Sequence, residues 1–191
     1  MTDVPSGDGR RARRQRSRDL AVEAMLDLLA EGVIRPTAQQ VAERSGVSLR
    51  SIFRIFDDVR SLHEAATEHH LARVGHLFRR IPAEGSLVER VQVTVEHLTR
   101  VYEEVGPVRR AAVRLAPESE VFAARLRDAR SWARGELDRV FAPELAGRPE
   151  RAAALEALLS FEAWDQLRQG QRLSVEEGRA VLVGGAQSLL A

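Results

Sequence analysis

The segment from Thr37 to Phe56, TAQQVAERSGVSLRSIFRIF, carries the signals for two short helices joined by a tight turn. Thr37 is placed to cap a first helix over about residues 38–44, because its hydroxyl can accept from free backbone N–H groups at the helix start. Gly46 follows, where the chain needs a left-handed conformation that glycine adopts without steric cost. Ser48 is placed to cap the second helix. The spacing predicts two helices packed at an angle across one turn.

Apolar residues at helical spacing are expected to hold these two helices together. The predicted joint consists of Val41, Ala42, Val47 and Ile52. The predicted buried stripe of the second helix consists of Ile52, Phe53 and Phe56, and its outer face carries Leu49, Arg50, Ser51 and Arg54. This pattern is typical of a helix-turn-helix, whose second helix enters a DNA major groove. The alternative is a pair of packed helices with no role in DNA binding.

A run of arginines precedes this unit. Residues 10–18, RRARRQRSR, hold six arginines in nine positions, which gives residues 1–18 a net charge of +4. We expect a flexible basic arm over residues 1–16, which is solvated when free and is suited to DNA phosphates or a minor groove. A helix over about 17–31 is predicted next, ending at Gly32. Its apolar stripe is Leu20, Ala24, Met25, Leu28 and Leu29.

The order of these signals resembles the DNA-binding domain of the TetR family of bacterial repressors. The residues that carry the resemblance are Gly32, Thr37, Val41-Ala42, Ser45-Gly46-Val47-Ser48 and Phe53-x-x-Phe56, within about residues 17–62. The resemblance implies a cytoplasmic homodimer that binds a pseudo-palindromic operator on double-stranded DNA. It also implies release of that operator by a small-molecule effector, of unknown identity, bound in the C-terminal part.

Three positions depart from the family pattern. The family usually has Tyr at Phe53, His at Ile55 and Lys at Val59, and those side chains commonly contact the DNA backbone. Apolar side chains cannot replace them, so the arm and the nearby arginines are expected to supply the phosphate contacts. The predicted DNA-binding residues are Arg14, Arg16, Thr37, Gln39, Ser48, Leu49, Arg50, Ser51, Phe53, Arg54 and Arg60.

The rest of the chain is predicted to be helical. Amphipathic patterns and helix-ending Gly and Pro residues predict helices over about 59–80, 86–105, 108–115, 118–141, 150–169 and 175–190. The fold class is therefore all-α. A three-helix helix-turn-helix domain over 17–60 is expected to precede a C-terminal ligand-binding and dimerisation domain over 61–191.

The last two predicted helices carry more apolar surface than one internal face requires. Such a helix is expected to be covered on both sides, so we predict a two-fold dimer through a four-helix bundle, with a larger intrachain core as the alternative. The predicted interface residues are Leu155, Leu158, Leu159, Val181, Leu182, Gly185 and Leu189.

The middle helices are where an effector is expected to bind. Apolar walls with a few polar groups are typical of a ligand pocket, although plain core packing gives the same pattern. The predicted lining is Leu98, Tyr102, Leu115, Phe122, Leu126 and Trp132, with His97 or Glu136 as further polar groups.

Composition excludes several other functions. The 191 residues include no cysteine, which removes disulfides, thiolate metal sites and cysteine nucleophiles. Four histidines fall in one predicted helix, but residues seven positions apart on a helix are too distant to share a metal ion. No catalytic motif, cofactor motif or membrane-length apolar run is present. We expect a regulator rather than an enzyme, with no metal, cofactor or membrane partner. The rival hypothesis is a helical interaction protein of the same fold that has lost specific DNA binding.

Overall fold

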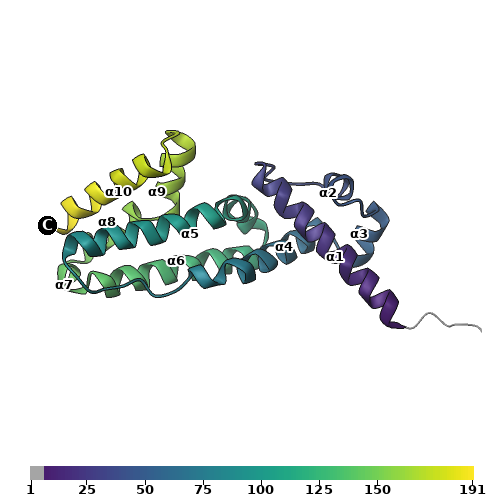
Figure 1. The fold of residues 1–191 in the computed structure, drawn as a ribbon, viewed down its shortest axis with the longest axis horizontal. Helices are drawn as coiled ribbons and strands as arrows, with labels where there is room; N and C mark the ends of the chain where they lie inside the picture. Colours follow the sequence, from purple (N-terminus) through teal and green to yellow (C-terminus); the bar gives the residue numbers. More distant parts are fainter. Residues whose placement is uncertain (1–6) are drawn as a thin grey trace, which may run out of the picture. The chain divides into compact units, whose positions relative to one another are not determined.

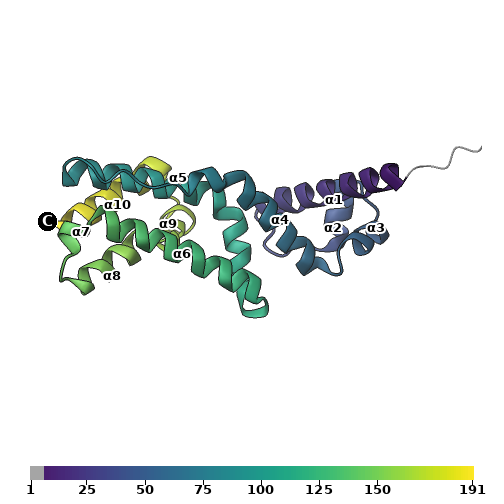
Figure 2. The same cartoon turned by 90° about the horizontal axis from the view of Figure 1, so that it is seen from below.

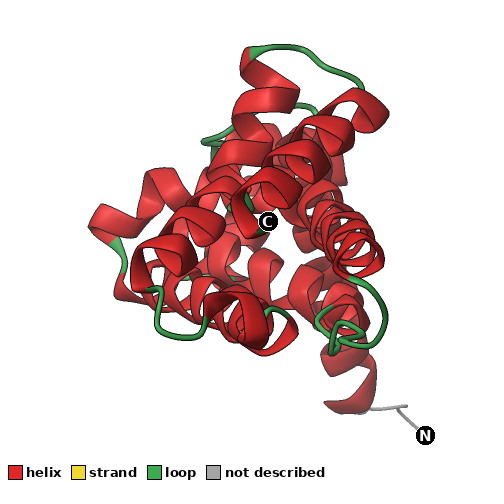
Figure 3. Ribbon diagram, turned by 90° about the vertical axis from the view of Figure 1, so that its left-hand side faces the viewer, coloured by secondary structure: helices red, strands yellow, loops and turns green. Residues whose placement is uncertain are grey.

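The computed structural model describes residues 7–191, and every regular element in this stretch is helical (Figure 3). The all-α prediction is confirmed. The chain forms two units: unit 1 comprises the residues up to Gly75 with Pro107–Phe122, and unit 2 comprises His76–Gly106 with Ala123–Ala191. These units divide the chain differently from the predicted domains, because residues 61–75 and 107–122 join the N-terminal part. Residues 1–6 of the predicted arm lie outside the described residues.

Unit 1 is built around the first four helices (Figure 1). They are α1 (Gly7–Ala30), α2 (Ala38–Ser45), α3 (Leu49–Ile55) and α4 (Val59–Val74). The end of α5 (Leu87–Leu115), the 3-10 turn Ala116–Glu118 and the start of α6 (Glu120–Val140) complete the unit. Met25, Val41, Ile52 and Leu62 come from four different helices and are all at most 1% exposed in one core. This shared core fixes the angle between α2 and α3.

Helix α1 begins ten residues before the predicted start, at Gly7 rather than at residue 17. The arginine run is therefore helical from Arg10 onward, and the expectation of a flexible arm is wrong for the described part. Arginine, alanine and glutamine all favour helix, and Gln15 donates to the Asp19 carboxylate one turn later at 2.7 Å. Leu20 was expected in the buried stripe but is 49% exposed, since the face that packs against α2 and α4 runs through Ala21, Met25 and Leu28.

Unit 2 contains most of α5 and α6 and the C-terminal helices (Figure 2). The 3-10 turn Gly75–Leu77 leads into it, and its later elements are α7 (Ala142–Leu145), α8 (Pro149–Leu158), α9 (Phe161–Asp165), a π-helical turn Gln166–Gly170 and α10 (Val175–Leu190). Its core includes Leu98 on α5, Phe141 before α7, Leu155 on α8 and Trp164 on α9, each at most 1% exposed.

The predicted break at Gly106-Pro107 is wrong, because α5 continues through both residues. A proline inside a helix removes one backbone hydrogen bond and costs roughly 3 kcal/mol. Val105, Val108 and Ala111 on either side of it are at most 7% exposed, so tertiary burial on both sides offsets that cost.

The predicted helix over 150–169 is divided in two. α8 ends at Leu158, and Ser160 caps a new helix, α9, by accepting from the Ala163 backbone N–H at 3.1 Å. The sequence pattern treated Ser160 as a helix-interior residue, whereas serine competes for backbone hydrogen bonds and favours cap positions. The break turns Phe161 and Trp164 into the core of unit 2. By contrast, α10 has the predicted bounds and the predicted Ser174 cap.

Candidate nucleic-acid interface

Both ends of α2 are fixed by the predicted residues. The Thr37 hydroxyl accepts from the Gln40 backbone N–H at 3.2 Å, and the Gln40 side chain accepts from the Thr37 N–H at 2.8 Å, which completes a capping box. Gly46 ends the helix with φ of 69°, in the left-handed region, and its N–H donates to the Ala42 carbonyl at 3.0 Å. The turn that aims α3 therefore depends on short-range chemistry.

The start of α3 is fixed in the same way. The Ser48 hydroxyl accepts from the Ser51 N–H at 3.3 Å, while Val47 before it is 7% exposed in the unit 1 core. Ile52 and Phe56 anchor the inner face of the helix at 1% and 4% exposed. The next helix, α4, is capped by Asp58, whose carboxylate accepts from the Ser61 N–H at 2.7 Å. That hydrogen bond holds the Asp58 pKa below its ordinary value.

The outer face of α3 presents two arginines to solvent. Arg50 and Arg54 are exposed and form no hydrogen bond or ion pair with any described residue. Leu49 is 37% exposed beside them, and Ser51 is half-buried. An arginine without an internal partner keeps all five N–H donors available to a phosphate or a guanine edge.

The three departures from the family pattern differ in position. Phe53 is 50% exposed, so its assignment to the buried stripe is wrong and the ring lies on the outer surface. Ile55 and Val59 are half-buried and pack against the unit 1 core. Their apolar side chains therefore have a packing role where the family's polar residues would face DNA.

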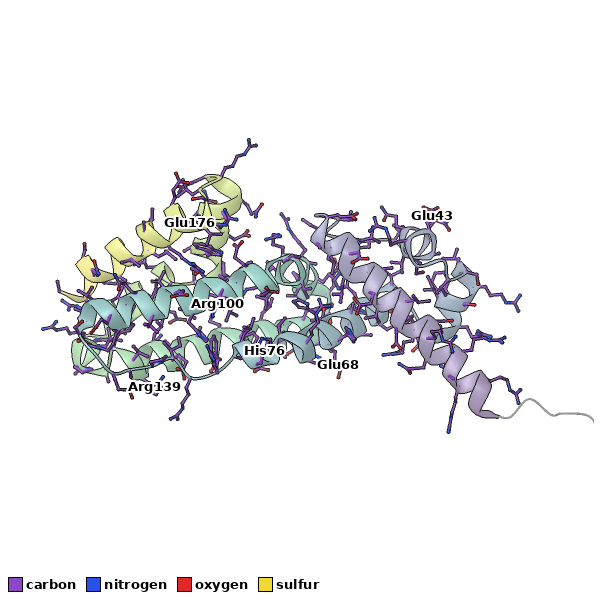
Figure 4. All side chains as sticks on the ribbon, in the orientation of Figure 1. Glu43, Glu68, His76, Arg100, Arg139 and Glu176 are labelled. Carbon is purple, nitrogen blue, oxygen red and sulfur yellow. The ribbon has the colours of Figure 1, made fainter. Side chains whose placement is uncertain are left out.

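Two other predicted DNA contacts are already engaged within unit 1. Arg60 donates to the Glu118 carbonyl at 3.2 Å and lies 3.5 Å from the Asp58 carboxylate, so part of its guanidinium is occupied. Gln39 is exposed and donates to Glu43 at 2.7 Å, and Figure 4 shows Glu43 on the outer side of α2. Arg14 and Arg16 are exposed on α1.

The predicted ligand residues fall in both units. Leu115 and Phe122 belong to unit 1, where Phe122 is fully buried and its ring packs edge-to-face on His63, 5.5 Å between centroids. Burial lowers the pKa of that imidazole. The other four belong to unit 2 and are Leu98, Tyr102, Leu126 and Trp132. The Tyr102 hydroxyl donates to the Leu159 carbonyl at 2.7 Å, so it has a structural partner.

Three buried polar atoms among the described residues of unit 2 have no hydrogen-bond partner, and they are Thr94 Oγ1, His97 Nε2 and Arg139 Nε. Two of them lie together on α5, and of these Thr94 was not predicted as a site residue. The two side chains lie three residues apart on the buried side of α5, and Thr94 is 0% exposed. The His97 ring lies 6.2 Å from the Trp132 ring, which in turn packs on Phe78 at 5.1 Å. Two polar residues three positions apart in an otherwise apolar helix stripe are the sequence signal that could have identified Thr94 and His97 as a pair.

The predicted dimer residues also separate into two groups. Leu155, Leu159 and Leu182 are at most 2% exposed inside unit 2, so they are not available to a second chain. The other four are half-buried or exposed, and they are Leu158, Val181, Gly185 and Leu189. Exposed Ala154, Ala157, Ala180 and Gly184 extend the same surface along α8 and α10.

Two further observations concern the described residues as a whole. None of their helices combines the length and the apolar character needed to cross a membrane. Within the same stretch, no three His, Asp or Glu side chains come together in a group that could hold a metal ion.

Three solved structures share this fold. A tetR-family transcriptional regulator from Streptomyces coelicolor is 22% identical, with a TM-score of 0.69 over 92% of this chain and 80% of that one. A transcriptional regulator from Rhodococcus sp. Rha1 is 19% identical, with a TM-score of 0.66 over 93% and 95%. A putative TetR-family regulator from Rhodococcus sp. is 21% identical, with a TM-score of 0.62 over 92% and 99%.

These likenesses establish the fold. The chain has the all-α fold of TetR-family transcriptional regulators, and the resemblance seen in the sequence is confirmed at that level. No protein-family model and no curated protein matches the sequence.

Proposed function

We propose that this chain is a DNA-binding transcriptional regulator, with α3 as the helix that enters a major groove. The observation that carries the proposal is the exposure of Arg50 and Arg54, without internal partners, on a short helix fixed at its start by a cap. A surface used only for solubility would gain nothing from a helix held this rigidly. The fold shared with transcriptional regulators supports the same function.

A selection from random genomic fragments tests this proposal. The protein is incubated with the fragments, bound DNA is sequenced, and the affinity for the enriched site is measured at several salt concentrations. A short pseudo-palindromic site and a steep fall of affinity with salt are expected, because phosphate contacts release counterions. The absence of any enriched site would instead support the helical interaction protein that has lost specific DNA binding.

A homodimer is part of the proposed mechanism. Two copies of α3 must lie about 34–36 Å apart to enter successive major grooves of one site. The surface best suited to hold them is the outer side of α8 and α10, where small residues allow close approach of two helices. Within one chain, a Cβ atom on Gly185 would lie 3.1 Å from the Leu158 side chain, so α8 and α10 of the same chain are already tightly packed at the centre of this surface. In the proposed mechanism, the bound dimer represses by occupying the operator.

Replacing Val181 by arginine should disrupt this dimer. Val181 is 48% exposed on α10, and a charge there would be desolvated against a second chain. Sedimentation at about 10 µM should give a dimer for the unmodified protein and a monomer for Val181→Arg, a weakening of at least about a hundredfold. Val113→Arg is the matched control, because Val113 is 44% exposed on the part of α5 in unit 1. A monomeric unmodified protein, or equal behaviour of both variants, would contradict the interface.

Release by an effector completes the proposed mechanism. The unpaired Thr94 hydroxyl and His97 ring nitrogen, near Trp132, favour a small molecule that carries both a donor and an acceptor beside an aromatic surface. Such a molecule can shift the equilibrium between the DNA-bound and the free dimer only by the difference between its affinities for those two states. A coupling free energy of about 1–3 kcal/mol between effector binding and DNA binding is typical. Compounds that release the selected operator identify it, and Thr94→Val should weaken their effect.

A further inference from the structure

Helix α1 has a basic groove on the side that faces the end of α3. Its lining consists of Arg11, Ala12, Arg14, Gln15, Arg18 and Ile55. The three arginines share one face, because residues at i, i+3 and i+7 lie on the same side of a helix. Figures 1 and 2 both show α1 running alongside α3 and continuing past it toward the N-terminus. The groove is open to solvent and lies entirely within unit 1.

We propose that this groove binds a phosphate of the DNA backbone while α3 lies in the adjacent major groove. The inference rests on the proposed function and adds a second point of contact to it. In a flexible arm, all the arginines would contact DNA in the same way. In the helix proposed here, only the arginines on one face of α1 contact DNA.

The electrostatics of the groove favour an anion. No acidic side chain lines it, and Arg11 and Arg14 are exposed with no hydrogen bond or ion pair to any described residue. The nearby Asp19 carboxylate accepts from the Gln15 amide at 2.7 Å. Two or three guanidinium groups around one open site, with donors uncommitted, are the arrangement that binds a phosphate oxygen pair.

The third arginine is held in place by an aromatic ring. The Arg18 guanidinium carbon lies 5.0 Å from the Phe56 ring centroid, and Phe56 is 4% exposed in the core. Arg18 therefore joins the base of the groove to the end of α3. A phosphate in the groove would be positioned relative to α3 rather than held by a mobile chain.

The groove adds phosphate donors to those of α3. Phe53 and Ile55 at this end of α3 have no polar side-chain atom, and neither has Val59 at the start of α4, so Arg54 is the phosphate donor that the last turn of α3 supplies. Ile55 forms one wall of the groove, so the arginines of α1 lie beside the apolar end of α3. Together with Arg54 they would hold the DNA backbone at this end of the helix.

The opposite face of α1 provides a matched control. Arg13 is exposed on the same helix but does not line the groove, and at 100° per residue it lies on the far side from Arg11 and Arg18. Arg11→Ala/Arg14→Ala and Arg13→Ala/Arg100→Ala remove the same charge from the protein. The control variant takes one arginine from the far face of α1 and the other from the exposed surface of unit 2.

The test measures affinity for the selected operator, and for a random duplex, as a function of salt. The groove double variant should bind both about tenfold more weakly and lower the salt slope by about 1–2, as expected for lost phosphate contacts. The control double variant should lower the affinity by less than about twofold, because it reduces the overall charge but removes no phosphate contact. Unchanged melting temperatures establish that both variants fold.

A duplex series with single methylphosphonate linkages then locates the phosphate. Neutralising one linkage should weaken the unmodified protein and have no further effect on the groove variant. Equal losses from both double variants, or no linkage with this behaviour, would overturn the groove and restore a non-specific arm. If the unmodified protein selects no site at all, the proposed function fails instead, which distinguishes the two results.

Discussion

Replacing Arg50 and Arg54 together by alanine should weaken operator binding by about a hundredfold or more without unfolding the protein. A well-placed arginine contact to a base is worth about 1–3 kcal/mol, and two such contacts together account for this loss. Neither side chain has an internal partner, so the free energy of unfolding should change by less than about 0.5 kcal/mol. Fluorescence anisotropy with the selected operator measures the first quantity, and thermal unfolding measures the second.

The single variants separate the two kinds of contact. A loss larger for the operator than for random DNA identifies a base contact, whereas equal losses and a smaller salt slope identify a phosphate contact. Arg100→Ala is the control, because it removes one exposed arginine from α5 in unit 2 (labelled in Figure 4). Arg100 pairs with Glu96 at 2.8 Å. Operator affinity that survives the double replacement would exclude α3 as the recognition helix.

The features that sequence predicted well depend on short-range interactions. Thr37, Gly46, Ser48 and Ser174 each act on a backbone group within four residues, so their positions follow from local chemistry alone. The bounds of α2 and α10 and the start of α3 are therefore close to the predicted ones. This is also why the resemblance to a known DNA-binding domain could be recognised from a quarter of the chain.

The features that sequence predicted poorly depend on what packs against them. Pro107 should end a helix by its local chemistry, but burial on both sides keeps α5 continuous. Leu155 and Leu182 have the pattern of an exposed interface and of a buried core alike, and only the packing of α8 on α10 decides between them. Hydrophobic periodicity identifies an apolar face but does not identify its partner.

The same limit applies to the candidate site. Phe53 and Ile55 lie two residues apart and are both apolar, yet Phe53 is exposed and Ile55 packs inward. The orientation of α3 against α1 decides this, and it also creates the arginine groove. A sequence pattern that treats residues 10–18 as a solvated tail cannot predict a groove between that segment and α3.

Replacing Trp164 by alanine should cost about 3–5 kcal/mol of unfolding free energy, as large buried aromatic residues typically do. Trp164 is 1% exposed, and its indole N–H donates to the Glu103 carboxylate at 2.8 Å. The Arg168 guanidinium also lies 5.9 Å from its ring. Urea unfolding at one fixed protein concentration measures the loss, because dimer stability depends on concentration. Trp132→Ala is the control: Trp132 is half-buried and should cost less.

The reason for so large an effect is the contact between this ring and α10. A Cβ atom on Gly178 would lie 2.7 Å from Trp164 Cζ3, so glycine is required for α10 to pack at this distance. Gly178→Ala alone should therefore destabilise the protein by about 1–3 kcal/mol through overpacking. In the double variant the new methyl group enters the space vacated by the ring, and the combined loss should be smaller than the sum of the two single losses. Additive losses would show that Trp164 and Gly178 act independently, and that α10 is positioned by other contacts.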